Sequence, residues 1–227
     1  LQDAPTRTPD AKDLFRQAQR ADYGSVAARD GIRPAELRSL PLAAWEQRVR
    51  VLALAIRLRR WPKVYRQLYC LPKDGESSPL NVRVLSIFSA VYRVETGAWY
   101  AILEGWMRTW LHPDLYGGIK GREPFEMAWE AQFDVEETLH ENWKLAIASV
   151  DYQKYFDSFP VEWTHGFLLA LGVPPALADM TADLYGNLSR TIKYGRALGQ
   201  PFRPFRGLGQ GDSISLIPAL ALVSCQF

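Results

Sequence analysis

Residues 148–158 read ASVDYQKYFDS, in which an apolar run ends on the carboxylate of Asp151. The residues from Lys144 to Val150 are largely apolar, which predicts a buried strand over 144–151. A buried carboxylate at the end of such a strand is costly unless it is paired or binds a metal ion. Asp151 is therefore a candidate metal ligand, and the adjacent Tyr152 carbonyl is a second one. A strand-end cap or a turn is the ordinary alternative for Asp151 taken alone.

Oxygen ligands of this kind favour a hard divalent cation such as Mg²⁺. In phosphoryl transfer, two such ions clamp the attacking and the leaving oxygen. Asp151 and Tyr152 thus indicate two-metal chemistry, for which further carboxylates are needed.

A second stretch, residues 206–215, reads RGLGQGDSIS and carries three glycines within five positions. Residues without a Cβ let a flat partner approach the backbone closely, and the Gln210 amide offers both a donor and an acceptor. These features favour contact with a ligand at Gln210 and Gly211. An ordinary strand-to-helix turn explains the same glycines equally well.

A third stretch begins at residues 71–73 (LPK), where Pro and Gly chemistry predicts a turn between strands over 64–71 and 81–85. Lys73 lies in the turn and Arg83 on the second strand. A hairpin with one lysine and one arginine can reach a bound triphosphate and offset the charge that develops during transfer. A solvated hairpin with incidental charges is the common alternative.

The remaining pattern predicts helices with short strands between them. Helical spacing or start signals mark residues 11–20, 34 onward, 41–60, 86–111, 125–142, 160–171, 174–188 and 213 onward, and strand patterns mark 190–194 and 201–206. Helices packed on a small antiparallel sheet make this an α+β fold.

Composition limits the class of protein. The formal net charge is +2, and the two cysteines and three histidines match neither a disulfide framework nor a zinc site. No apolar run approaches the ~18–20 residues of a membrane span, and no signal-peptide pattern precedes the first helix. We expect an intracellular protein, in the nucleus or the cytoplasm, that does not bind membranes.

The densest basic stretch lies between Arg57 and Arg66. Arg57 and Arg60 are candidates for contact with a template phosphate backbone. A solvated helix end, whose cations satisfy the helix dipole, accounts for them equally well.

Taken in chain order, these motifs resemble the reverse transcriptase domain of non-long-terminal-repeat retrotransposons and group II introns. The matching segments run from DGI at 30–32 through LPK at 71–73, NVRVLS at 81–86, the glycine-arginine loop at 116–122, Asp151 with residues 156–157, and the QGDSIS segment at 210–215. The resemblance implies a right-hand polymerase fold. Residues 1–29 would be an N-terminal lead, 30–124 the fingers, and 125–227 a partial palm.

The resemblance also implies a role for each matched residue. Asp151 would be a catalytic, metal-binding carboxylate. Phe156 would stack beneath the incoming sugar and exclude a 2′-hydroxyl. Lys73, Arg83, Tyr152 and Gln210 would bind the nucleotide, and Gly211 would contact the template. The partners would be an RNA template, a DNA primer and deoxynucleoside triphosphates (dNTPs), with two Mg²⁺ ions as cofactors.

The sequence departs from the family pattern in several places. Gly209 stands where proline or arginine is usual, and Ser213 and Leu216 replace the usual prolines. The family's Asp-Asp pair occurs nowhere in the chain, which begins without Met and ends inside an apolar run. We therefore expect a fragment of a longer protein that is catalytically inert by itself.

Two alternatives stay open. A viral-type RNA-dependent RNA polymerase would use Asp151 with Asp157 as its carboxylate pair. A decayed polymerase fold would act only as an RNA-binding or protein-interaction module.

Overall fold

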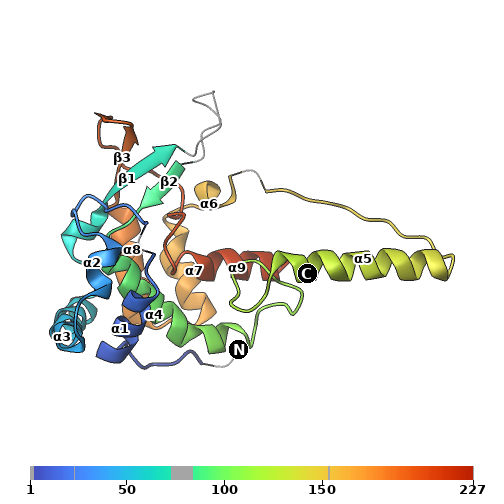
Figure 1. Cartoon of the computed structure of the whole chain (residues 1–227), viewed down its shortest axis with the longest axis horizontal. Helices are drawn as coiled ribbons and strands as arrows, with labels where there is room; N and C mark the ends of the chain where they lie inside the picture. The colour runs from blue at the N-terminus through green and yellow to red at the C-terminus, as the bar shows by residue number, and fades with distance from the viewer. Residues whose placement is uncertain (1–2, 23, 73–83, 153, 227) are drawn as a thin grey trace.

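The computed structural model of the chain describes residues 3–22, 24–72, 84–152 and 154–226. Figure 1 shows most of the helices gathered below a small sheet, with one long helix, α5, projecting to the side. The helices are α1 Ala11–Gln19, α2 Pro34–Arg38, α3 Leu42–Leu58, α4 Ala90–Met107, α5 Pro124–His140, α6 Tyr155–Ser158, α7 Trp163–Leu171, α8 Pro175–Gly186 and α9 Leu216–Ser224. Each predicted helix is confirmed, with its ends shifted by a few residues.

Local chemistry explains where the first helices begin. The Asp13 amide donates to Asp10 Oδ1 at 2.9 Å and the Asp10 amide donates to Asp13 Oδ2 at 3.1 Å, which forms a capping box before α1. Pro34 occupies the first turn of α2, where its missing N–H costs no helical hydrogen bond. These caps direct Leu14 of α1 and Leu37 of α2 into the core.

The sheet has four strands in the order β2-β1-β3-β4. The strands are β1 Gln67–Pro72, β2 Val84–Ile87, β3 Ser189–Tyr194 and β4 Ala197–Leu198. The pairs β1–β2 and β3–β4 are antiparallel, but β1 and β3 run parallel, with Gln67 opposite Ser189. The predicted antiparallel sheet is therefore wrong in this respect: the sheet is mixed, because a long helical crossover rather than a hairpin joins its two central strands.

The predicted buried strand over 144–151 is also wrong. Residues 143–152 are extended and exposed, with Ile147 72% and Val150 74% exposed, and no described residue pairs with them in a ladder. Figure 1 shows this segment running back from the far end of α5 to α6. A single extended segment leaves its peptide groups to water and buries little apolar surface, so an apolar composition alone cannot make it a strand.

Smaller differences concern the ends of elements. A 3₁₀ turn, η1 Lys63–Arg66, replaces the start of the strand predicted from residue 64. The strand predicted over 201–206 is reduced to isolated bridges, Arg190 to Phe202 and Pro160 to Arg206. Because a turn follows the glycines, the last helix begins at Leu216 and not at residue 213 as predicted.

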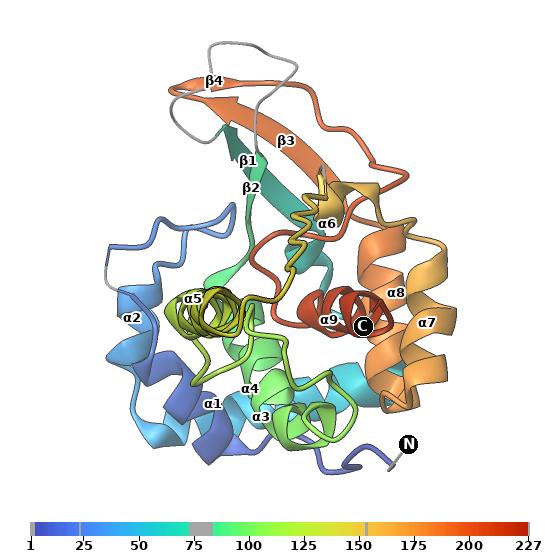
Figure 2. The ribbon, with the colours of Figure 1, turned by 90° about the vertical axis from the view of Figure 1, so that its right-hand side faces the viewer.

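A single hydrophobic cluster joins buried side chains from every helix except α5 and α6. Its largest members include Trp45, Trp61, Trp99, Tyr92 and Tyr185. Figure 2, which views α5 along its axis, shows α7 beside α8 and the sheet above the helices. The aromatic residues of the helix predicted over 86–111 are buried in this cluster, with Phe88 just before α4 and Tyr92, Trp99 and Trp106 on it. In the parts of the chain that are described, no helix is long and apolar enough to cross a membrane.

Candidate functional site

The glycine loop, residues 207–211, lies against α6 and joins the two motif segments that the sequence singled out. The Leu208 amide donates to the Phe156 carbonyl at 2.8 Å, and the Gly207 amide donates to the Phe159 carbonyl at 2.8 Å. Segments fifty residues apart in the sequence, 148–158 and 206–215, are thus connected through their backbones.

Glycine is required at position 207 for two reasons. Its φ is +103°, in the left-handed region that L side chains rarely adopt. An added Cβ would also lie 3.3 Å from the Asp157 Cα and 3.4 Å from the Arg190 guanidinium. Arg190, buried on β3, donates to the Gly207 carbonyl at 2.8 Å, so β3 and α6 hold this end of the loop.

Glycine at position 209 makes room for a side chain from another element. An ideal Cβ there would lie 2.2 Å from Cζ of Phe88, which fills the space below the loop. The Phe88 ring stacks on Tyr92 with a centroid separation of 5.3 Å. The segment between β2 and α4 therefore packs directly under the glycine loop.

A buried carboxyl group closes the other end of the loop. Asp212 Oδ2 accepts from the Tyr185 hydroxyl at 2.7 Å, and Oδ1 accepts from the Ile214 amide at 3.1 Å. The Tyr185 hydroxyl in turn accepts from the Gly209 amide at 3.1 Å. The Ser215 hydroxyl lies 2.7 Å from the Asp212 carbonyl and 3.1 Å from the Gly209 carbonyl. The loop is thereby fixed to α8 and to the start of α9.

Burial dominates the electrostatics of this group. It raises the pKa of the Asp212 carboxyl to about 6, while the hydrogen bonds from Tyr185 and the Ile214 amide oppose the rise. Burial and the nearby Asp212 carboxyl hold the pKa of the Tyr185 hydroxyl well above its usual value. The Tyr92 hydroxyl, also fully buried, interacts with the same carboxyl group.

The outer side of the loop carries the predicted ligand contacts. Gly211 is exposed with φ +104°, and its ideal Cβ would lie 3.4 Å from the Ser86 carbonyl of β2. Gln210 is half-buried, and its side chain makes no hydrogen bond to another described residue. Gly211 therefore lies beside β2, next to a glutamine whose side chain has no hydrogen-bond partner among the described residues.

The other predicted nucleotide residues lie in or before α6. Phe156 is half-buried and packs against the core, with its carbonyl bonded to the glycine loop. Tyr152 is exposed, and its hydroxyl donates to the Gln226 side chain. Tyr155 donates to the Ala219 carbonyl at 2.8 Å, which ties α6 to α9.

Asp151 stands apart from this cluster. It is exposed, and it forms no hydrogen bond or ion pair with a described residue. Within the described ranges no three His, Cys, Asp or Glu side chains are grouped to hold a metal ion. The described residues therefore supply one candidate carboxylate and not a complete magnesium site. Lys73 and Arg83 lie outside the described residues.

The basic stretch is partly neutralised by α8. Arg59 pairs with Asp179 at 2.5 Å, and Arg66 pairs with Asp183 at 2.5 Å. Arg57 and Arg60 are exposed, and no hydrogen bond or ion pair joins either side chain to the described part of the glycine loop. The structure does not bring Arg57 and Arg60 to the glycine loop.

Sequence reasoning missed most of the supports of the glycine loop. Asp212 and Tyr185 lie inside quoted motifs, but a buried hydrogen bond between them has no signature in spacing alone. Arg190 and Phe88 carry no sequence signal for this role, because their contacts depend on the packing of β3 and α4.

The fold and site together define a mixed α/β protein in which a glycine loop connects a small sheet to the helices α6, α8 and α9. No protein-family model matches the chain. Over 173 residues the chain is 27% identical to the "Transposon TX1 uncharacterized 149 kDa protein" of Xenopus laevis. The match covers 73% of this chain and 13% of that protein, so the chain spans a small part of its relative's length.

Proposed function

We propose that the chain is part of a retroelement-derived reverse transcriptase domain, comprising the fingers and part of the palm. The contact between its two motif segments carries the proposal: the Leu208 amide bonds the Phe156 carbonyl at 2.8 Å, next to Gln210 and Gly211. The similarity to a transposon protein supports the retroelement origin. Residues 1–29 form the lead, 30–124 the fingers and 125–227 the palm part.

In this proposal the glycine loop holds the end of a nucleic-acid duplex. Gly211, without a side chain and beside Ser86, contacts the template strand, and Gln210 contacts the nascent base pair. Phe156 lies under the incoming sugar and selects deoxyribose. Lys73 and Arg83, which lie outside the described residues, bind the triphosphate. Arg57 and Arg60 contact the template at a distance from the glycine loop. They bind the part of the template strand that extends beyond α8.

Asp151 and the Tyr152 carbonyl contribute one part of a Mg²⁺ site. The remaining carboxylates have to come from outside the described residues, because none is grouped with Asp151 among those that are described. The 227-residue chain alone is therefore expected to bind an RNA template and DNA primer without extending the primer.

Primer extension by the longest natural product that contains this chain tests the proposal. With an RNA template, a DNA primer, dNTPs and Mg²⁺, the wild-type protein should extend the primer. Asp151→Asn should lower the rate by at least about 100-fold, since losing a metal ligand costs more than losing a residue that supports one. The exposed Asp3→Asn serves as the matched control. Equal extension by the two variants would remove Asp151 from the metal site.

The two alternative functions predict different results in this assay. Preference for ribonucleotides over dNTPs would assign the protein to the RNA-dependent RNA polymerases, for which Asp157 beside Gly207 is the second carboxylate. The isolated, exposed position of Asp151 favours a non-catalytic interaction module instead. RNA binding with no extension by the full natural product would establish that module.

A further inference from the structure

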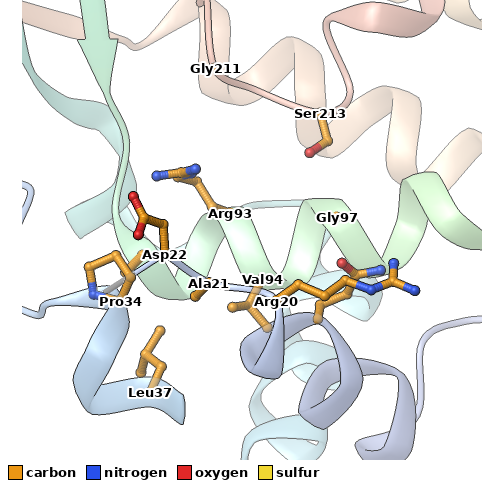
Figure 3. Close-up of a pocket in the computed structure, with 12 residues that line it drawn as sticks. Arg20, Ala21, Asp22, Pro34, Leu37, Arg93, Val94, Gly97, Gly211 and Ser213 are labelled. Atoms are coloured by element: carbon orange, nitrogen blue, oxygen red, sulfur yellow. The ribbon is translucent and has the colours of Figure 1, made fainter. Parts of the chain in front are cut away.

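A polar pocket of about 200 Å³ lies between α1, α2, α4 and the turn that follows the glycine loop. We call it the Arg20–Arg93 pocket, and Figure 3 shows most of its lining. The lining residues are Gln17, Arg20, Ala21, Asp22, Pro34, Leu37, Ala90, Arg93, Val94, Gly97, Gly211 and Ser213. The pocket thus joins the N-terminal helix to Gly211, one of the residues assigned to the template.

Two arginines that form no ion pair with a described residue contribute most of the charge of the pocket. Arg20 at the end of α1 and Arg93 in the first turn of α4 are exposed, and neither guanidinium pairs with a described residue. Asp22 is the one carboxylate among the described residues of the lining. The lining therefore carries one net positive charge, and in Figure 3 the two guanidinium groups lie at opposite ends of the pocket.

Two of the lining residues, Gly211 and Ser213, also carry neutral donors. The Gly211 amide, the Ser213 amide and the Ser213 hydroxyl make no hydrogen bond to another described residue. Figure 3 shows the Ser213 hydroxyl turned from the upper wall toward α4 and Gly97. An oxyanion in the pocket would thus meet the Ser213 hydroxyl as well as arginine, and charge-assisted hydrogen bonds of this kind hold anions in proteins.

The walls of the pocket are held in place before any ligand binds. Three of the lining residues are buried, namely Pro34, Leu37 and Val94. The Arg38 guanidinium donates to the Ala21 carbonyl at 3.0 Å, which fixes the turn that carries Arg20 and Asp22. The backbone that carries Arg20 and Asp22 is therefore fixed before an anion enters, and only the exposed arginine side chains have to become ordered.

We propose that the Arg20–Arg93 pocket binds the phosphodiester backbone of a single-stranded nucleic acid as the strand passes Gly211. The inference rests on the proposed function and adds a template-strand contact made by the N-terminal helix. The two guanidinium groups lie at opposite ends of the Arg20–Arg93 pocket. This arrangement fits a strand with successive phosphates better than it fits one compact anion. The volume is below the ~300 Å³ at which pockets begin to enclose drug-sized ligands, so a whole nucleotide does not fit.

Fluorescence anisotropy with a labelled single-stranded RNA and the 227-residue chain tests the proposal. Arg20→Gln and Arg93→Gln should each weaken binding about three- to tenfold, as expected for an exposed charge-assisted contact. Each should lower the slope of log K against log salt by about 0.7. Arg93→Lys should retain most of the affinity, because it keeps the charge. Arg50→Gln changes an exposed arginine of α3 that lacks a described partner, and it is the matched control.

Asp22→Asn gives a test in the opposite direction. Its side-chain oxygen can still accept from the Gly24 amide, which lies 3.1 Å from Asp22 Oδ1, so the turn is kept while the opposing charge is lost. This variant should bind the RNA about two- to threefold more tightly and steepen the salt dependence. A purely structural role of the pocket would not produce tighter binding.

The outcomes separate this inference from the proposed function. RNA binding by the wild type with no loss in Arg20→Gln and Arg93→Gln overturns the pocket and leaves the polymerase proposal standing. No RNA binding by the wild type overturns both. Competition by a dNTP or inorganic phosphate that depends on the two arginines would make the pocket a small-anion site, and equal competition by an acidic peptide would make it a peptide site. Either result overturns the strand assignment.

Discussion

The substitution Gly209→Ala tests how tightly the glycine loop is coupled to the segment below it. The new Cβ would lie 2.2 Å from Phe88 Cζ and 2.5 Å from Cε2. Carbon atoms in contact are about 3.5–4.0 Å apart, so the ring or the loop has to move by about 1.5 Å. Phe88 is only 2% exposed and stacks on Tyr92, so the ring has no free space to enter. We expect a loss of about 2–3 kcal/mol in the free energy of unfolding.

A double-mutant cycle isolates the contact. Phe88→Ala alone should cost about 3–5 kcal/mol because it leaves a cavity in the core. In that background Gly209→Ala should cost less than about 0.5 kcal/mol, since the added methyl group enters the cavity. Urea unfolding followed by tryptophan fluorescence measures all four free energies. Equal costs of Gly209→Ala in the two backgrounds would refute the steric argument. Gly105→Ala, whose Cβ meets nothing within 4 Å on α4, is the control.

Three further predictions concern buried groups. Burial raises the pKa of the Asp212 carboxyl from its usual 3.8 to about 6, so between pH 3.8 and pH 6 the folded state binds more protons than the unfolded state. The free energy of unfolding of wild type relative to Asp212→Asn should therefore fall by about 2 kcal/mol as pH rises from 4 to 6, measured by urea unfolding at each pH. Glu95→Ala should cost about 3–5 kcal/mol by the same assay, because it leaves the Arg48 guanidinium, 2.8 Å from Glu95 Oε1, without its buried partner. A thiol reagent should label exposed Cys225 in the native protein, whereas Cys70, whose buried thiol has a raised pKa, should react only after unfolding.

The helices were predictable because their signals are local. The spacing of Trp45, Val49 and Leu52 predicts α3 without knowledge of any other element, and Pro34 marks the start of α2. The resulting helices pack with those residues buried or half-buried, as the spacing predicts. Helix periodicity depends only on neighbours three and four positions away, so a single sequence contains it.

The strands were less predictable because each needs a partner. Residues 64–71 and 144–151 have similar apolar compositions, yet β1 forms beside β2 and β3 while 144–151 is extended and pairs with no strand that the structure describes. The parallel direction of the central strands follows from the pairing of β1 with β3, and no residue in either strand indicates that pairing. The site shows the same division: the glycines at 207–211 are visible in the sequence, whereas the Phe88 ring that requires Gly209 is not.

The parallel pairing of the two central strands has a consequence for synthesis of the chain. Gln67 pairs with Ser189, which lies 122 positions later. At ribosomal speeds of about 5–20 residues per second, β1 waits on the order of ten seconds before its neighbour exists. During that interval one edge of the β1–β2 ribbon is open to other chains, and closing so long a loop is intrinsically slow. We expect nascent chains arrested before β3 to require a chaperone that shields this edge, and chains released after α9 to need it much less.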